Sequence, residues 1–157
     1  MTSDQDVLAT AFYTLQFGDT SVPPVGVLPV SLSDWWSGVG EKSSTSDTAI
    51  ALANPGVGRA EYELTAHQTD GDTAGSAIIQ LGPGEQTAQF LGQLIPELSI
   101  PFQGCLNLHC AQAKVAPMTL TQHESDGSVA AIAMESSLGS TEFYFPQALR
   151  GEAQNTT

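Results

Sequence analysis

Apolar and polar residues alternate along most of the chain, in short runs separated by Gly, Pro, Asn and Asp. A period of two is typical of β-strands that bury one face, and these four residue types favour turns. The pattern therefore predicts an all-β domain. The predicted strands cover residues 11–17, 48–53, 60–68, 75–81, 102–109, 115–122, 129–135 and 141–145.

One sequence pattern occurs twice and predicts two β-hairpins. The run from Leu64 ends in Asp70-Gly71, and the run from Leu120 ends in Asp126-Gly127. Asp-Gly between alternating runs favours a type I′ turn, in which both central residues have positive φ. Gly71 and Gly127 are therefore predicted to be structural turn residues.

Two segments break the alternation. Residues 22–30 contain three prolines, which cannot donate ladder hydrogen bonds, so an edge strand or an extended crossing segment is predicted there. In residues 86–95, Phe90, Leu91, Leu94 and Ile95 follow a helical spacing before Pro96. This spacing predicts one short helix that bridges two sheets.

Eight or nine short strands at regular spacing predict an antiparallel β-sandwich with Greek-key connections. The order of the segments resembles a family of immunoglobulin-like β-sandwich modules, which occur, often in tandem, in large secreted or surface-anchored bacterial proteins. The resemblance implies a structural or adhesive module without a cofactor, and places residues 145–147 near a module junction. It is carried by residues 48–56, the Asp70-Gly71 hairpin and residues 81–91, 102–104 and 145–147.

The length and the strand positions predict a single domain. A chain of 157 residues is long enough to bury a core of its own. We expect residues 11–147 to form the sandwich, residues 1–10 to form a flexible or arm-like N-terminal segment, and residues 148–157 to form a C-terminal tail or linker.

Composition excludes several classes of partner. The chain has 17 acidic and 4 basic residues, for a net charge of -13, which repels nucleic acid and anionic lipid surfaces. With 41% hydrophobic and 13% charged residues, it does not have the composition of a disordered protein. No apolar run approaches the roughly 18 residues of a membrane span, so we expect no membrane insertion. The scarcity of Lys and Arg is common in secreted bacterial β-proteins and predicts an extracellular or cell-surface location.

The two cysteines leave two alternatives open. If residues 104–110 form one strand, Cys105 points outward and Cys110 toward the core, about 16 Å apart. A disulfide needs Cα atoms within about 7 Å, so this geometry predicts two free thiols. If the strand is broken, a disulfide closing a small loop becomes possible, as an extracellular pair of cysteines would suggest.

The sequence contains no motif typical of a metal site or a catalytic site. His67, His109 and His123 lack zinc-ligand spacing and are predicted to be unrelated surface residues. Asp70-Gly71-Asp72 lacks the rest of a calcium loop. Glu61 and Glu63 fit a solvated sheet surface, and no Gly-x-Ser-x-Gly elbow is present. We therefore predict no catalytic, cofactor or metal site and expect that the protein is not an enzyme.

The aromatic residues suggest two kinds of binding. Trp35 and Trp36 face opposite ways on an extended segment, so one indole can pack in the core while the other lies at the surface. With Tyr13, these residues could form a glycan-stacking platform, which makes a carbohydrate-binding module the alternative function.

The leading hypothesis is an extracellular structural or adhesion module that assembles with neighbouring copies or tandem domains by β-strand addition, as a filament or surface-layer subunit does. It rests on the apolar character of the two end strands. The candidate assembly residues are Phe12, Leu15, Phe17, Phe143 and Phe145.

Overall fold

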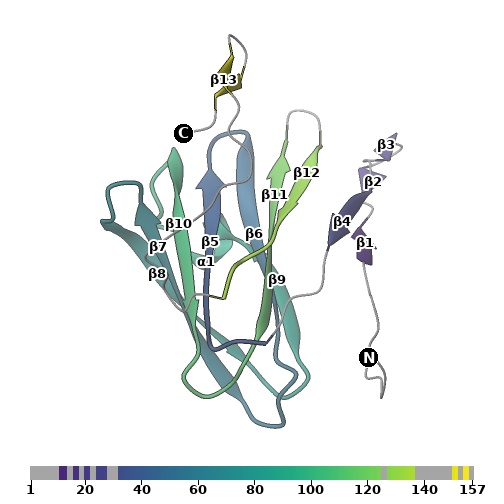
Figure 1. Ribbon diagram of the computed structural model, residues 1–157, viewed down its shortest axis with the longest axis vertical. Helices are drawn as coiled ribbons and strands as arrows, with labels where there is room; N and C mark the ends of the chain where they lie inside the picture. Colours follow the sequence, from purple (N-terminus) through teal and green to yellow (C-terminus); the bar gives the residue numbers. More distant parts are fainter. Residues whose placement is uncertain are drawn as a thin grey trace.

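The body of the protein is one antiparallel sheet arrangement of eight strands with a short helix (Figure 1). The computed structural model describes residues 11–13, 16–17, 20–21, 24–27, 32–124, 127–136, 150–151 and 154–155. The all-β prediction is confirmed. The elements are β5 (Trp35–Lys42), β6 (Ser46–Ala53), β7 (Ala60–Gln68), β8 (Thr73–Leu81), β9 (Gln86–Phe90), α1 (Leu91–Leu94), β10 (Phe102–His109), β11 (Ala116–His123) and β12 (Val129–Ile132).

The strand order is β12-β11-β6-β5-β10-β7-β8, with β9 on β6. β5 and β6 share only the pair Lys42↔Asp47. Beyond that corner β5 pairs with β10, whereas β6 has β11 on one side and β9 on the other. The sheet therefore consists of two groups of four strands, β12-β11-β6-β9 and β5-β10-β7-β8, which are joined at one corner.

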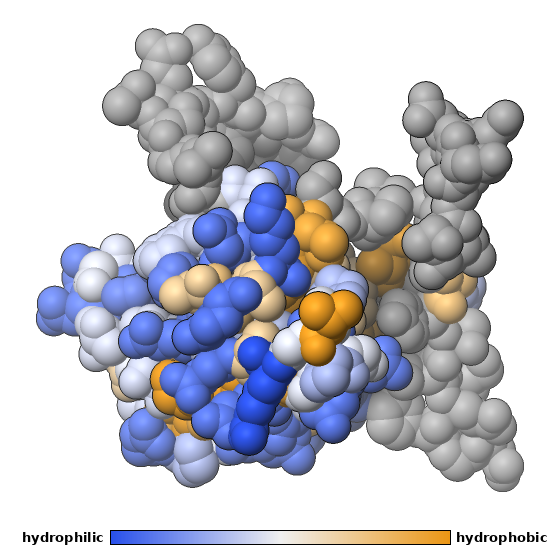
Figure 2. Space-filling view, turned by 90° about the horizontal axis from the view of Figure 1, so that it is seen from below, coloured by the Kyte–Doolittle hydropathy of each residue, from blue (hydrophilic) through white to orange (hydrophobic). Residues whose placement is uncertain are grey.

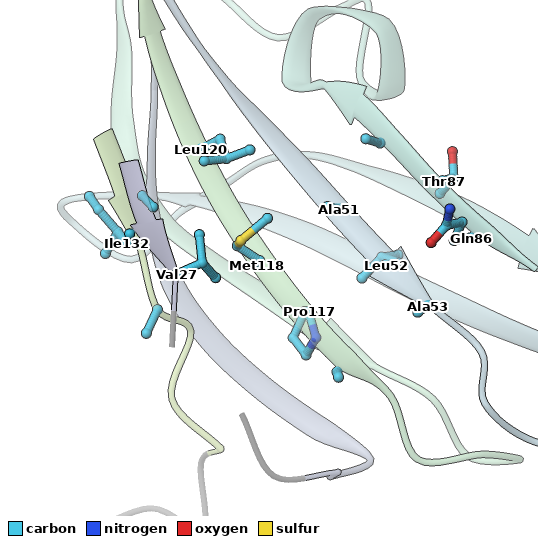
Figure 3. A pocket seen from close by; sticks show the side chains of 15 residues that line it. Val27, Ala51, Leu52, Ala53, Gln86, Thr87, Pro117, Met118, Leu120 and Ile132 are labelled. Carbon is cyan, nitrogen blue, oxygen red and sulfur yellow. The ribbon is translucent and has the colours of Figure 1, made fainter. Parts of the chain in front are cut away.

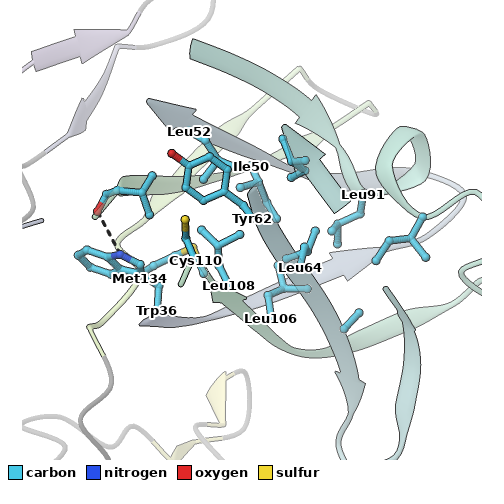
Figure 4. Packing of buried hydrophobic residues seen from close by; sticks show 14 of the residues in the cluster. Trp36, Ile50, Leu52, Tyr62, Leu64, Leu91, Leu106, Leu108, Cys110 and Met134 are labelled. Atoms are coloured by element: carbon cyan, nitrogen blue, oxygen red, sulfur yellow. Dashed lines mark hydrogen bonds between the residues drawn. The ribbon is translucent and has the colours of Figure 1, made fainter. Parts of the chain in front are cut away.

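Both groups of strands contribute to a single apolar core (Figure 4). Alternate residues of β6 and β7 are buried, as expected for strands with one inward face. The helix and the segment after it contribute Leu91 and Ile95. The largest apolar members are Trp36, Ile50, Leu52, Tyr62, Leu64, Ile79, Leu81, Leu91, Ile95, Leu98, Phe102, Leu106, Leu108 and Met134.

Three pairs of very short strands lie outside this body: β1 (Ala11–Tyr13) with β4 (Val25–Val27), β2 (Gln16–Phe17) with β3 (Thr20–Ser21), and β13 (Arg150–Gly151) with β14 (Gln154–Asn155). The single strand predicted over residues 11–17 is wrong, because β1 and β2 pair with different partners. β4 lies within residues 22–30 and pairs with β1 alone among the described strands, which fits an edge segment. Residues 1–10 and the strand predicted over residues 141–145 lie outside the described residues.

The boundaries of two elements differ from those predicted. Residues 86–90 form strand β9 on β6, so the helix covers only Leu91–Leu94. The helical spacing begins at Phe90, and the residues before it carry no helical pattern of their own. Strand β5 was missed because its Ser and Gly residues hide the alternation, although Trp36 and Lys42 both point inward.

The first hairpin does not have the predicted type I′ turn. Gly71 has φ of 94°, but no residue other than glycine has a positive φ in the described part of the chain. The N–H of Gly71 donates to the carbonyl of Gln68 at 3.0 Å, and the N–H of Gln68 donates to the carbonyl of Asp72 at 2.8 Å. These bonds define a tight turn followed by a glycine bulge, the usual form of a three-residue hairpin loop. In the second hairpin Gly127 has φ of 69°, and residues 125–126 lie outside the described residues.

Candidate interaction surfaces

An apolar groove of about 810 Å³ crosses the outward side of the β12-β11-β6-β9 group (Figure 3). β4 lies at its rim and contributes Val27. The labelled lining residues are Val27, Ala51, Leu52, Ala53, Gln86, Thr87, Pro117, Met118, Leu120 and Ile132. The groove could hold an apolar side chain or segment.

Small residues on paired strands produce this hollow. Ala51 lies between Ala88 on β9 and Met118 on β11, and Leu120 is paired with Ala131. Paired residues point to the same side of a sheet, so these side chains line one face. The sequence carried a signal for this surface, because alanine takes every outward position from Ala49 to Ala53 where polar residues would be expected. None of the residues predicted to bind or assemble belongs to this surface as the structure describes it.

The outward side of the β5-β10-β7-β8 group is more polar. The ring of Trp35 packs on that of His109, with centroids 4.9 Å apart and planes tilted by 48°. One step along the strands, Ser37 Oγ donates to Asn107 Oδ1 at 2.8 Å. Figure 2 shows a different side, the lower end of the molecule as drawn in Figure 1, where hydrophilic side chains also cover most of the coloured surface. On the outward side of the β5-β10-β7-β8 group, Trp35, His109, Ser37 and Asn107 form a row. This row can contact a polar ligand through the exposed Trp35 ring and several hydrogen-bonding groups.

The two tryptophans lie on opposite sides of β5. Trp35 is 39% exposed, whereas Trp36 is 2% exposed and its Nε1 donates to the carbonyl of Val115 at 3.1 Å. Trp36 is a core residue and offers no face for glycan stacking. The side chain of Tyr13 lies outside what the structure describes, so it adds nothing to a platform around Trp35.

Both cysteines are free, as continuous strand geometry predicts. Cys105 is exposed on β10, and Cys110 is buried just beyond the end of this strand. Cys105 pairs across the strands with His67, whose Nδ1 lies 3.3 Å from the carbonyl of Gly71. His123 lies on β11 with its Nδ1 4.0 Å from Glu41 Oε1. In the described ranges no three His, Cys, Asp or Glu residues are placed to hold a metal ion.

A buried Lys42 and a half-buried Asp47 lie at the corner that joins the two groups of strands. Lys42 Nζ donates to the carbonyl of Leu98 at 3.3 Å, and Asp47 Oδ2 accepts from the N–H of Gly92 at 3.2 Å. Burial raises the pKa of Asp47, and this effect outweighs the lowering by the Gly92 N–H and the Lys42 charge. Lys42 Nζ and Asp47 Oδ2 are tied to main chain, whereas Asp47 Oδ1 is buried without a hydrogen-bond partner among the described residues.

Three strands at the margins of the sheet lack the charges and prolines that often protect an edge, although β8 has a bulge at Ala74. Among the described strands, β8 pairs only with β7, β9 only with β6, and β12 only with β11. None of the three contains a charged residue or a proline, whereas inner strands carry Glu41, Asp47 and Glu61. Natural proteins commonly place charges or prolines on edges to prevent strand addition. In this protein charged residues lie on inner strands, and the three marginal strands have none.

The predicted assembly residues are only partly placed. Phe12 on β1 is highly exposed. Phe17 belongs to β2, but its side chain is not among those described, and Leu15, Phe143 and Phe145 lie outside the described residues. The sequence analysis missed Ile78 on β8, which is 57% exposed on an edge. The signal was an isoleucine at an outward position of a predicted strand.

Comparisons of the chain with protein-family models, with curated proteins and with solved structures give no match. The part of the chain that the structure describes has no helix with the length and apolar character needed to cross a membrane.

Proposed function

We propose that this protein is a non-catalytic structural or adhesion module of the extracellular space or cell surface, which assembles with neighbouring copies or tandem domains by β-strand addition. The observation that carries the proposal is the absence of charge and proline from β8, β9 and β12. An unprotected edge is a template for another strand. A filament or surface-layer subunit would use such edges.

The finer fold assignment belongs to the same proposal. Two groups of four strands that share one core support an immunoglobulin-like β-sandwich, in which each group is one layer. β5 pairs with β10 within one group and β6 pairs with β11 within the other, so each group joins strands from the first and second halves of the chain. This connectivity suits a module that bears load between its ends.

The composition supports an extracellular setting. Only 13% of the residues are charged and only four of these are Lys or Arg, so uncharged polar side chains must cover much of the surface. The apolar groove beside β12 supplies a second surface that a neighbouring module could cover.

The test is the oligomeric state of the full-length protein. We expect light scattering after size exclusion to show oligomers that grow in abundance between micromolar and millimolar protein. Circular dichroism at both ends of that range should show the same folded β-protein. A strictly monomeric species throughout would refute assembly.

A carbohydrate-binding module is the second candidate. The exposed Trp35 ring beside His109, with the Ser37 and Asn107 pair next to it, is the observation that favours it. A glycan array should then give binding that is lost in Trp35→Ala and kept in Val39→Ala, a substitution on the same strand. An empty array would remove this candidate.

A further inference from the structure

We propose that the free edge of β8 is a self-association site that pairs antiparallel with β8 of a second copy about a two-fold axis. This inference rests on the proposed assembly function and specifies its surface. β8 lies at the left margin of the sheet in Figure 1 and pairs with β7 along nearly its whole length. Its other side presents a row of main-chain N–H and C=O groups for which the described part of the chain provides no partner strand.

β8 suits this role better than the other two margins. It has nine residues, compared with five in β9 and four in β12. β4 lies beside β12, and α1 follows β9 without a break. β8 therefore offers the longest edge for main-chain hydrogen bonds, and its regular part runs from Gly75 to Leu81, beyond the bulge at Ala74.

A second copy is the occupant because β8 is complementary to itself. Each copy carries a net charge of -13, so contacts between copies are opposed by repulsion wherever acidic residues face each other. The strand Thr73–Leu81 has no charged residue, so antiparallel pairing of two copies places no like charges directly across the junction. The acidic residues Glu61 and Glu63 lie one strand further in, on β7.

The side chains also select a register. Residues paired across a continuous sheet must point to the same face, so the two-fold axis has to pass through a residue and not between two. An axis at Ile78 places the two exposed Ile78 side chains against each other. It also pairs Ser76 with Gln80 of the second copy and Ala77 with Ile79 of the second copy. Apolar groups then meet apolar groups and polar groups meet polar groups on both faces.

The main experiment compares two lysine substitutions in the full-length protein by analytical ultracentrifugation. Ile78→Lys should raise the dimer dissociation constant by at least about tenfold, because two like charges would face each other at the axis. The monomer should stay folded, because the introduced ammonium group would lie opposite Glu63 on β7. The matched control is Val39→Lys, since Val39 is 54% exposed, on a strand that is paired with β10. This control should associate as the parent does.

The outcomes separate this inference from the proposed function. If the parent assembles and Ile78→Lys assembles equally well, the β8 site is refuted while assembly stands. If the parent remains monomeric at millimolar concentration, both are refuted. Loss of association in Val39→Lys as well as Ile78→Lys would place the contact on the sheet face and overturn the edge pairing.

Cross-linking tests the register. In a Cys105→Ser background, which removes the exposed thiol, Ile78→Cys should give a disulfide-linked dimer on mild oxidation. Ser76→Cys should not, because residue 76 would face residue 80 of the second copy. Cross-linking through residue 76, or through neither position, would overturn the proposed register.

Discussion

Gly71 closes the first hairpin in a backbone conformation that few other residues adopt. Its φ of 94° is in the left-handed region, and a Cβ added there would meet no atom within 4 Å. The cost of Gly71→Val is therefore conformational, about 1–2 kcal/mol of unfolding free energy. Chemical denaturation should show this loss. Gly58→Val is the control, because Gly58 also has open space but no positive φ. Equal effects in both variants would show that the turn conformation does not matter.

Asp47 is expected to make stability depend on pH in an unusual direction. Burial raises the pKa of its carboxyl group in the folded protein, so the folded state favours the protonated form. Its contribution to stability is complete below the carboxyl pKa of the unfolded chain and is lost as pH rises through the raised folded pKa. Asp47→Asn keeps an oxygen that can accept from the Gly92 N–H but removes the titration.

The measurement is the difference in melting temperature between the parent and Asp47→Asn. As pH rises from about 3 to about 7, the parent should lose stability relative to the variant. Asp34→Asn, at an exposed carboxylate, should show no such trend. A difference that stays constant, or that changes in the opposite direction, would contradict the burial of the charge at this corner.

At the scale of elements, the course of strand β10 keeps the thiol of Cys105 apart from the thiol of Cys110, which directly follows the strand. Cys105 lies on the outward face and Cys110 in the core, and both are free. One thiol should react rapidly with Ellman's reagent in the native protein, and the second only on unfolding, because thiol reactivity requires access. Dithiothreitol should leave the melting temperature unchanged. Two slow thiols, or a melting temperature that falls with reductant, would contradict the strand geometry.

The sequence pattern predicted elements best where alternation was strong. Residues 102–109 were predicted with the observed bounds of β10, and Leu106 and Leu108 face the core as expected. β5 was missed because Gly38 and Gly40 occupy positions where the inward side of the strand lacks room for a side chain. A Cβ at Gly40 would lie 2.6 Å from Leu106 Cδ1, so packing favours glycine at this position. Glycine in turn weakens the alternation of apolar and polar residues from which a strand is predicted.

At the scale of the whole molecule, charge opposes the proposed assembly. Copies with a net charge of -13 repel each other, and salt screens this repulsion over about 8 Å at physiological ionic strength. Raising the salt concentration from about 0.01 M to about 0.15 M should therefore strengthen self-association, as measured by sedimentation velocity. Parallel melting curves would separate this effect from changes in folding. Association that weakens with salt would indicate an interface held by ion pairs.

The sequence by itself determined most of the strands of the body and which of their faces is apolar, because both depend on the local period of two, but it did not reveal β5 or β9. It also predicted that the cysteines stay apart, since their spacing on a strand decides that distance. The two predicted hairpins pair as β7 with β8 and β11 with β12, but only the tertiary structure decided how the remaining strands pair. β5 lies on β10 and not along β6, its neighbour in sequence, and this leaves β8, β9 and β12 at the margins. Pairing depends on contacts between residues far apart in the chain, which a local pattern does not encode. The exposed edge at Ile78 and the groove beside Met118 both follow from that non-local choice.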